Sequence, residues 1–453
     1  MNSVAKLRPL PLALTLCGWL PTGCTDPQIC VGDCTEEGET DGEGETEDGS
    51  GGDSLEALRT CNLPTTADVS QCGDDVAQPG ELCLAEPVSI SLGDEPYASA
   101  VGDFDGDGRA DLMWSTEFGT LSLNLGAAMS TLEEGRGWSL PGEDASPLTT
   151  AAAADFDGDG FVDVVTVSSV GQIDLLRGDG AGDLLEVRSV LSDPQLAWGP
   201  HAVDDDADGD LDLAIIIAGA PQNRLTLVND GLGNFTLTPR FDESGSTLFP
   251  RTVVDFDGLL LADHLHGEDD QIFLRRELPG GTSTTIIDLP ASYLRASDIE
   301  VADHDADGFM DLFALVSDRD ALVDVGGSPF EVYTSLVVFE GVDAGTPSAV
   351  ALEQSAALPL DCSASDLRVV DVNGDGVVDA VSSHHAVNEQ SASVVVRLGG
   401  GAEPFGQVLR VPAPAGIDSG GPVHVGDFDG DGLTDVLTVH RNDGALVLYR
   451  GRR

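Results

Sequence analysis

One nonapeptide, of the form D-x-[DN]-x-D-G-x-x-D, occurs six times in this 453-residue chain, and each copy is followed directly by an apolar run. The six copies span residues 103–111, 155–163, 204–212, 303–311, 371–379 and 427–435. A seventh copy, at residues 255–263, keeps the spacing but has Leu259 and Leu260 at its fifth and sixth positions. Recurrence at a steady period of roughly 50 residues indicates a repeat architecture, in which each repeat is one supersecondary unit.

The nonapeptide has the ligand chemistry of a calcium loop, since calcium is a hard cation that takes roughly six to eight oxygen ligands. Positions 1, 3 and 5 place short oxygen-bearing side chains on the inside of a tight turn, and the glycine at position 6 allows the sharp bend. Position 7 can add its backbone carbonyl, and the aspartate at position 9 closes the shell. A single Asp-Gly cluster is more simply an ordinary turn. Six copies in one register indicate calcium loops.

Strand-like segments surround each loop, and four of them can be recognised in a complete repeat. An apolar stretch leads into the loop, as at Ala151–Ala154 in the second repeat. In the third repeat, Leu213–Ile217 follows the loop, and Leu225–Leu227 and Phe235–Leu237 come next, separated by the turn Asn229–Gly231. Four short strands per repeat, arranged radially, are typical of a β-propeller. The sequence therefore predicts an all-β fold with four-stranded antiparallel blades.

The two ends of the repeat region predict how the ring closes. The last repeat stops after Leu446–Tyr449 and lacks its fourth strand, whereas Val88–Leu92 is an unassigned strand upstream of the first loop. Pairing of these two strands would complete the last blade and leave no open edge. We therefore expect a seven-bladed propeller closed by an N-terminal strand.

The loops, with their flanking strands and glycine-rich turns, resemble FG-GAP/VCBS repeats, the propeller repeats also found in integrin alpha subunits, over roughly residues 86–453. In that family the loops bind calcium at the blade rims on one face, so the resemblance implies about six calcium ions. Asn373 still offers a carbonyl oxygen, whereas Leu259 and Leu260 remove one ligand and the turn glycine, so we expect no tight site in the fourth loop. The ligands implied position by position are Asp103, Asp105, Asp107, Arg109 and Asp111; Asp155, Asp157, Asp159, Phe161 and Asp163; Asp204, Asp206, Asp208, Asp210 and Asp212; Asp303, Asp305, Asp307, Phe309 and Asp311; Asp371, Asn373, Asp375, Val377 and Asp379; and Asp427, Asp429, Asp431, Leu433 and Asp435.

The charge of the chain limits its partners. It carries 80 acidic and 21 basic residues, a formal net charge of −59, and such a surface repels the phosphate backbone of a nucleic acid. Without metal, the carboxylates gathered in each loop repel one another, so calcium is expected to contribute to folding stability. We expect a monomer that does not bind nucleic acid.

The N-terminus has the features of an export signal, with a short basic region before the apolar run Leu10–Leu20, which is too short to span a bilayer. Thr22-Gly23-Cys24 resembles a bacterial lipoprotein box, although Pro21 stands where leucine is usual. The resemblance implies a signal peptide at residues 1–23 and a lipid on Cys24. The chain would then be anchored to the outer membrane or cell surface; plain secretion is the alternative.

Two short regions precede the predicted propeller. Residues 24–60 are rich in Glu, Asp and Gly and cannot bury a core, so we expect a disordered tether. Residues 61–85 form a small Cys-rich collar, in which Cys72–Cys83 resembles a repeat of myxobacterial-type surface proteins. The six cysteines other than Cys17 and Cys24 allow 15 pairings. Disulfides suit an exported protein better than zinc, because the spacings are irregular.

No catalytic motif is present in the sequence. Lys6 is the only lysine, and no G-x-S-x-G elbow, H-E-x-x-H motif or dinucleotide fingerprint occurs. We therefore expect a non-enzymatic surface module that binds or adheres to a protein or glycan. The alternatives are a carbohydrate-active enzyme, such as a polysaccharide lyase or hydrolase, and a structural surface lipoprotein without a dedicated ligand. Acid and base residues clustered in the central channel would favour the enzyme.

A candidate ligand face lies opposite the predicted calcium loops, where the connections between second and third strands and between blades emerge. Aromatic side chains there suit carbohydrate or protein partners. The alternative is that these side chains only cap the interfaces between blades. The candidates are Tyr97, Trp114, Trp198, His201, His384, His385 and His440.

Overall fold

The computed structural model describes residues 82–452, apart from residues 129–131, 141–146, 193–195, 218–222, 242–250, 260–262, 269, 279–280, 291–292, 326–327, 344–349, 361–363, 386–391 and 401–404. The predictions for the signal peptide, for Cys24, for the tether and for most of the collar lie outside the described residues. Within the described part of the chain, no helix has the length and hydropathy needed to cross a membrane.

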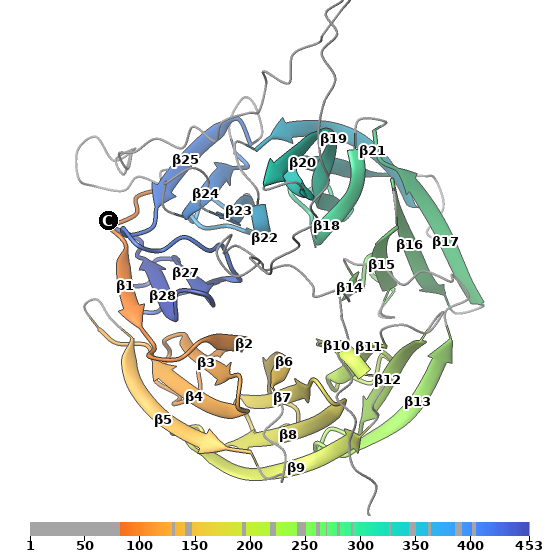
Figure 1. The fold of residues 1–453 in the computed structure, drawn as a ribbon. Helices are drawn as coiled ribbons and strands as arrows, with labels where there is room; N and C mark the ends of the chain where they lie inside the picture. The colour runs from red at the N-terminus through yellow and green to blue at the C-terminus, as the bar shows by residue number, and fades with distance from the viewer. Residues whose placement is uncertain are drawn as a thin grey trace, which may run out of the picture. The chain divides into compact units, whose positions relative to one another are not determined.

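The described residues form seven four-stranded antiparallel sheets arranged around a ring, as predicted (Figure 1). In blades 1 to 6 the strands follow chain order from the centre outward, and we call them A, B, C and D. The blades are β2 (Pro96–Gly102), β3 (Asp111–Thr116), β4 (Thr120–Leu125) and β5 (Glu133–Ser139); β6 (Leu148–Ala154), β7 (Asp163–Ser168), β8 (Gln172–Gly178) and β9 (Leu184–Ser192); β10 (Leu196–Val203), β11 (Asp212–Ile217), β12 (Asn223–Asn229) and β13 (Phe235–Phe241); β14 (Arg251–Val254), β15 (Asp263–Glu268), β16 (Gln271–Leu278) and β17 (Gly281–Asp288); β18 (Tyr293–Ala302), β19 (Asp311–Val325), β20 (Ser328–Asp343) and β21 (Val350–Pro359); and β22 (Ala364–Val370), β23 (Asp379–His384), β24 (Ser393–Leu398) and β25 (Gln407–Pro412).

The seventh blade joins the two ends of the ring, as the sequence predicted. It contains β26 (Val423–Gly426), β27 (Asp435–His440), β28 (Ala445–Tyr449) and β1 (Val88–Ser91). Strand β1 pairs antiparallel with β28, from Val88 opposite Leu448 to Ser91 opposite Ala445. A bridge between Leu84 and Gly451 extends the pairing. The edge of β28 is therefore covered by a strand from the opposite end of the sequence.

The closure predicts different effects for neighbouring positions of β1. Ile90 packs against the hydrophobic cluster between blades 7 and 1, whereas Ser89 is exposed. We expect Ile90→Asp to lower the free energy of unfolding by about 2–3 kcal/mol, because it places a charge against apolar surface. Ser89→Asp should change it by less than about 0.5 kcal/mol. Denaturant titrations of both variants check this, and equal losses would contradict an inward-facing Ile90.

The hydrophobic core lies between adjacent blades. The B strands, such as β7 and β27, are buried along their whole length because a neighbouring blade covers each face. Aliphatic side chains fill most of these interfaces. A phenylalanine at position 2 of the loop is buried in four blades and anchors the loop in the interface: Phe104, Phe156, Phe256 and Phe428.

Blade 5 has the longest B and C strands of the ring. Through residues 318–331, β19 and β20 extend as a hairpin, with Leu322 opposite Glu331 and Val325 opposite Ser328. The ladder of this blade therefore continues beyond the length of the other B and C strands.

Candidate metal centres

Each calcium-type loop is a turn held by the carboxylate at position 1, and in the first loop also by the carboxylate at position 3. In the first loop, the backbone N–H groups of Asp107 and Gly108 donate to Asp103 at 3.1 and 2.9 Å, and that of Asp107 also donates to Asp105 at 3.2 Å. In the other five intact loops, the N–H of the position-6 glycine likewise donates to the position-1 aspartate. The glycine at position 6 is left-handed in all six, with φ between 79° and 95°, as the sequence required: Gly108, Gly160, Gly209, Gly308, Gly376 and Gly432.

The aspartate at position 9 ties each loop to its own blade, an arrangement that we call the position-9 latch. Asp163 is fully buried; its Oδ2 accepts the N–H of Phe156 at 3.1 Å, and its Oδ1 accepts the N–H of Gly178 at 2.9 Å. The latch is present in all seven blades, including the fourth. The other six aspartates are Asp111, Asp212, Asp263, Asp311, Asp379 and Asp435. The spacing of the nonapeptide predicted metal binding by these residues but not this structural role.

Three of the predicted ligand positions converge in space. Carboxylate oxygens from positions 1, 3 and 9 lie within 4.8 Å of one another in the first four loops, for example in Asp103, Asp105 and Asp111. The position-5 carboxylate of Asp107 accepts the N–H of position 7 at 2.9 Å. The phenylalanine side chains at position 7 in the second and fifth loops are exposed, so this position can offer an ion only its backbone carbonyl.

The position-9 carboxyl groups are buried close to other carboxylates. Burial is the main cause that raises their pKa, and the backbone N–H donors of the latch act in the opposite direction. The pKa rises to about 6 for Asp111, Asp163, Asp212 and Asp379, and to about 7 for Asp263 and Asp435. These all-oxygen, carboxylate-rich clusters suit a hard divalent cation, so the residues of the six intact loops fit calcium. The fourth loop lacks one of the donors.

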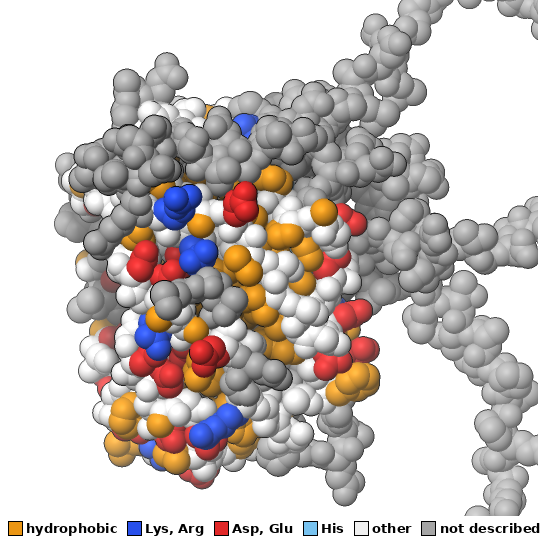
Figure 2. All heavy atoms as spheres, turned by 90° about the vertical axis from the view of Figure 1, so that its left-hand side faces the viewer, with side chains coloured by type: hydrophobic (Ala, Val, Ile, Leu, Met, Phe, Trp, Pro, Cys, Tyr) orange, Lys and Arg blue, Asp and Glu red, His pale blue; other side chains and the backbone are white. Residues whose placement is uncertain are grey.

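Arginine side chains also reach the loops, and the sequence analysis did not identify them. Three arginines of C strands, or of the residue directly after one, contact the position-3 aspartate of their own blade. Each stands directly before the residue whose N–H completes the latch. The pairs are Arg177 with Asp157, Arg276 with Asp257 at 3.5 Å, and Arg450 with Asp429 at 3.7 Å. On the side of the ring shown in Figure 2, basic side chains likewise lie beside acidic ones.

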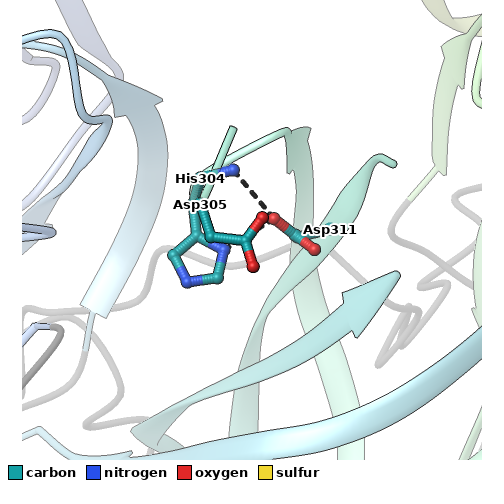
Figure 3. A group of neighbouring side chains, drawn as sticks. All are labelled: His304, Asp305 and Asp311. Atoms are coloured by element: carbon teal, nitrogen blue, oxygen red, sulfur yellow. Dashed lines mark hydrogen bonds and ion pairs between the residues drawn. The ribbon is translucent and has the colours of Figure 1, made fainter. Parts of the chain in front are cut away.

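The fifth loop carries a histidine at position 2 (Figure 3). The backbone N–H of His304 donates to Asp311 Oδ2 at 2.8 Å, and His304 Nδ1 lies 2.6 Å from the same oxygen. The hydrogen bond to Asp311 raises the pKa of His304, while burial acts in the opposite direction. The ring packs against Phe313 of its own blade and Phe405 of blade 6, with centroids 6.0 and 5.6 Å away. His304 therefore belongs to the core of the blade junction.

The loops lie at junctions between blades. The N–H of Gly182, in the C–D turn of blade 2, donates to the carbonyl of Phe104 in the first loop at 3.0 Å. Asn229 of blade 3 donates to the carbonyl of Phe156 in the second loop at 2.6 Å. The N–H of Ala110 in the first loop donates to the carbonyl of Asp427 in the seventh at 2.8 Å. The geometry of one loop therefore affects the packing of the next blade.

Three of the candidate ligand-face residues are buried. Trp114 donates from Nε1 to Asn124 at 2.8 Å, and the Nε2 atoms of His384 and His440 lie 2.9 and 2.7 Å from the hydroxyls of Ser382 and Thr438. These side chains do not lie on an exposed face, because neighbouring blades cover both sides of the B strands that carry them. The alternative prediction, that these side chains pack in the interfaces between blades, is therefore the correct one for Trp114, His384 and His440.

The remaining candidates are Tyr97, His201, His385 and Trp198. Tyr97, His201 and His385 are half-buried. The guanidinium of Arg441 lies 3.4 Å above the ring of Tyr97, and His385 Nδ1 accepts the N–H of Gly420 at 2.9 Å. Trp198 pairs with Ile216 in the ladder of β10 and β11.

Two apolar side chains of this face were missed by the sequence analysis. Phe118 and Val170 occupy the B–C turns of the adjacent blades 1 and 2, where they are 68% and 55% exposed. An apolar residue in a polar turn between two recognisable strands is the sequence signal that would have found them.

A second polar cluster lies on the A strands that line the centre of the ring. Arg368 donates to Glu300 at 2.8 Å and lies 3.5 Å from Asp366. The backbone N–H groups of Leu367 and Val423 donate to Asp298 and Asp366 at 2.8 and 2.7 Å, and so connect blades 5, 6 and 7. Burial raises the pKa of Glu300 to about 8 and that of Asp366 to about 7, against the opposing effect of Arg368.

A cavity of about 450 Å³ adjoins this cluster, lined by residues of β2, β6, β22 and β26. Arg368, His424 and Ser99 are its polar lining residues, and His424 Nε2 lies 2.8 Å from Ser99 Oγ. Burial and the nearby Arg368 lower the pKa of His424 to about 3. The centre of the ring therefore contains acid and base groups that the sequence analysis had not identified.

Comparisons with known proteins agree with the repeat architecture. A family model for FG-GAP-like repeats matches residues 155–215 and 371–438, and one for FG-GAP repeats matches residues 96–128. The chain thus contains FG-GAP repeats on a seven-bladed β-propeller. No curated protein matches it.

Among solved structures, two crystal structures of BBS1N in complex with ARL6DN, soaked with lead and with mercury, are similar to this chain. Each has 13% identity and a TM-score of 0.52 and covers 82% of this chain, with 97% and 98% of the other chain covered. An Agrocybe aegerita lectin, described as recognising non-reducing terminal N-acetylglucosamine, has 15% identity, a TM-score of 0.47, and coverage of 73% and 81%. At such identities the likeness to BBS1N concerns the fold alone.

Proposed function

We propose that this chain is an exported, calcium-binding propeller that serves as a binding or adhesion module for a protein or glycan at the cell surface. The observation that carries the proposal is the convergence of carboxylates from positions 1, 3 and 9 in loops that contact the neighbouring blade. Calcium bound there would offset the repulsion of these groups and fix the blade junctions. Cys24 would hold the module to the membrane through a lipid, and the residues before the propeller would act as the tether.

Direct measurement can test the calcium part of this proposal. Isothermal titration of the metal-free protein should detect about six strong equivalents of calcium, one for each intact loop. Failure to detect any calcium uptake would contradict it.

The partner part of the proposal predicts a dependence on the B–C face. A screen of glycans and surface proteins, run with calcium and with chelator, would first identify a ligand. Substituting Phe118 and Val170 together by serine should then weaken binding by about tenfold or more, because exposed apolar anchors contribute most of the energy at such surfaces. Leu185→Ser is the matched control, since Leu185 is 63% exposed on the outer strand β9. Equal affinities of the double variant and the control would exclude the B–C face.

The central cluster favours a second candidate, a carbohydrate-active enzyme. Glu300 and Asp366 flank Arg368 beside a cavity, and carboxyl groups with raised pKa values can act as general acids. The bonds to Arg368 and to the next blade's backbone also give these groups a structural role, so we rank the enzyme second. Release of reducing ends from a polysaccharide, abolished by Glu300→Gln, would favour the enzyme over the binding module.

A further inference from the structure

The fourth loop keeps the carboxylates of a metal site but not the full set of donors. Asp255, Asp257 and Asp263 each place an oxygen within 4.8 Å of the others. The N–H of Leu259 donates to Asp255 and to Asp257, both at 3.1 Å, as the aspartate at this position does in the first loop. The first half of the turn, up to Leu259, is therefore preserved, although the side chain of Leu259 supplies no oxygen. Three carboxylates remain close together without the ligand set that calcium needs.

A buried arginine faces this incomplete site. Arg276, on β16, is 2% exposed and is among the largest fully buried side chains of the described residues. Its guanidinium lies 3.5 Å from Asp257 Oδ2, and the side chain of Asp257 is also 2% exposed. A guanidinium is removed from water at such a depth only when carboxylates compensate for the lost hydration. The negative charge of the loop provides that compensation.

Arg276 is more deeply buried than the arginines at the same position in other blades. Arg177 and Arg450 occupy the same position in blades 2 and 7, but their side chains are about a quarter exposed, at 26% and 25%. Those loops keep all their aspartates. The corresponding residues in blades 1, 3, 5 and 6 are Leu125, Val228, Glu340 and Leu398. The enclosed arginine therefore coincides with the one loop that has lost its position-5 aspartate.

We propose that the guanidinium of Arg276 balances the charge of the fourth loop in place of a divalent cation, so that blade 4 is held by an internal cation and takes up no calcium. The inference rests on the proposed function only in treating the six intact loops as calcium sites. The internal ion pair would make this blade independent of the calcium concentration.

The first test is made in chelator, where the intact loops are empty of metal in every variant. Arg276→Gln should lower the midpoint of thermal unfolding by about 5 °C, because it leaves buried carboxylates without their partner. Arg276→Lys, which keeps the charge, should recover part of this loss. Arg275→Gln is the matched control, since Arg275 is the neighbouring residue and pairs with Glu277 at 3.7 Å. Equal midpoints for Arg276→Gln and Arg275→Gln would overturn the proposal.

The second test counts calcium by equilibrium dialysis. Restoring the loop with Leu259→Asp and Leu260→Gly should leave the number of bound ions at about six while Arg276 is present, and the further change Arg276→Gln should raise it to about seven. An additional ion bound by the variant that retains Arg276, or none gained on its removal, would overturn the proposal. A wild-type protein that binds no calcium would instead contradict the proposed function, and the comparison in chelator would remain valid.

Discussion

Removal of calcium is expected to lower the free energy of unfolding by about 2.7 kcal/mol for every site held at 100 times its dissociation constant. With several sites the total exceeds the effect of any single substitution. The physical reason is that each intact loop gathers carboxylates from positions 1, 5 and 9, and in five of the six also from position 3, so that a bound divalent cation offsets their repulsion. Thermal unfolding followed by circular dichroism, in millimolar calcium and in EDTA, measures the difference.

Magnesium provides the control for this expectation. It is smaller than calcium, requires a nearly ideal octahedral site and dehydrates reluctantly, so it should restore only part of the lost stability. Full recovery with magnesium would indicate general charge screening rather than specific sites. Superimposable unfolding curves with calcium and with EDTA would show that the loops do not bind calcium in the folded protein.

The architecture of the ring could be predicted because its signals are local and repeated. The loop motif fixes where each A strand ends and each B strand begins, and the missing fourth strand of the last repeat pointed to Val88–Leu92. The structure confirms that this segment pairs with β28. A period of this kind gives the same information several times, so one degenerate copy does not obscure it.

The position-9 latch could not be predicted in the same way, because its second donor is distant in the sequence. Asp311 accepts the N–H of Gly341, which is 30 residues further along the chain. One signal was nevertheless present. The fourth copy lost positions 5 and 6 but kept Asp263, which indicates that position 9 has a role that does not require metal.

The residues of the ligand face were predicted less accurately than the strands, because the B strands are buried on both faces. Alternation of apolar and polar residues normally separates a buried face from an exposed one. In β3 and β23 both faces are buried between blades, so polar and aromatic residues at the strand ends are enclosed as well. Trp114 and His384 were therefore assigned to a surface on which they do not lie.

Loss of the position-9 latch should destabilise the folded protein whether or not metal is bound. Asp163→Ala is expected to reduce the free energy of unfolding by about 2–6 kcal/mol, because it leaves the buried N–H groups of Phe156 and Gly178 without an acceptor, at about 1–3 kcal/mol each. The loss should be present in EDTA as well as in calcium. Asp163→Asn, which keeps one acceptor oxygen, should lose about half as much. Denaturant titration of the three proteins in both conditions measures these differences.

Asp159→Ala separates the latch from metal binding within the same loop. Asp159 lies at position 5, is partly exposed, and accepts the N–H of Phe161 at 3.0 Å and a guanidinium N–H of Arg177 at 3.2 Å. Its loss should cost less than about 1 kcal/mol in EDTA, because water can replace the carboxylate at an exposed N–H group and a partly exposed ion pair contributes little. In calcium the same substitution removes a predicted ligand, so its cost should rise. Equal losses for Asp163→Ala and Asp159→Ala in EDTA would mean that the two buried hydrogen bonds contribute little, and that position 9 is kept for the metal alone.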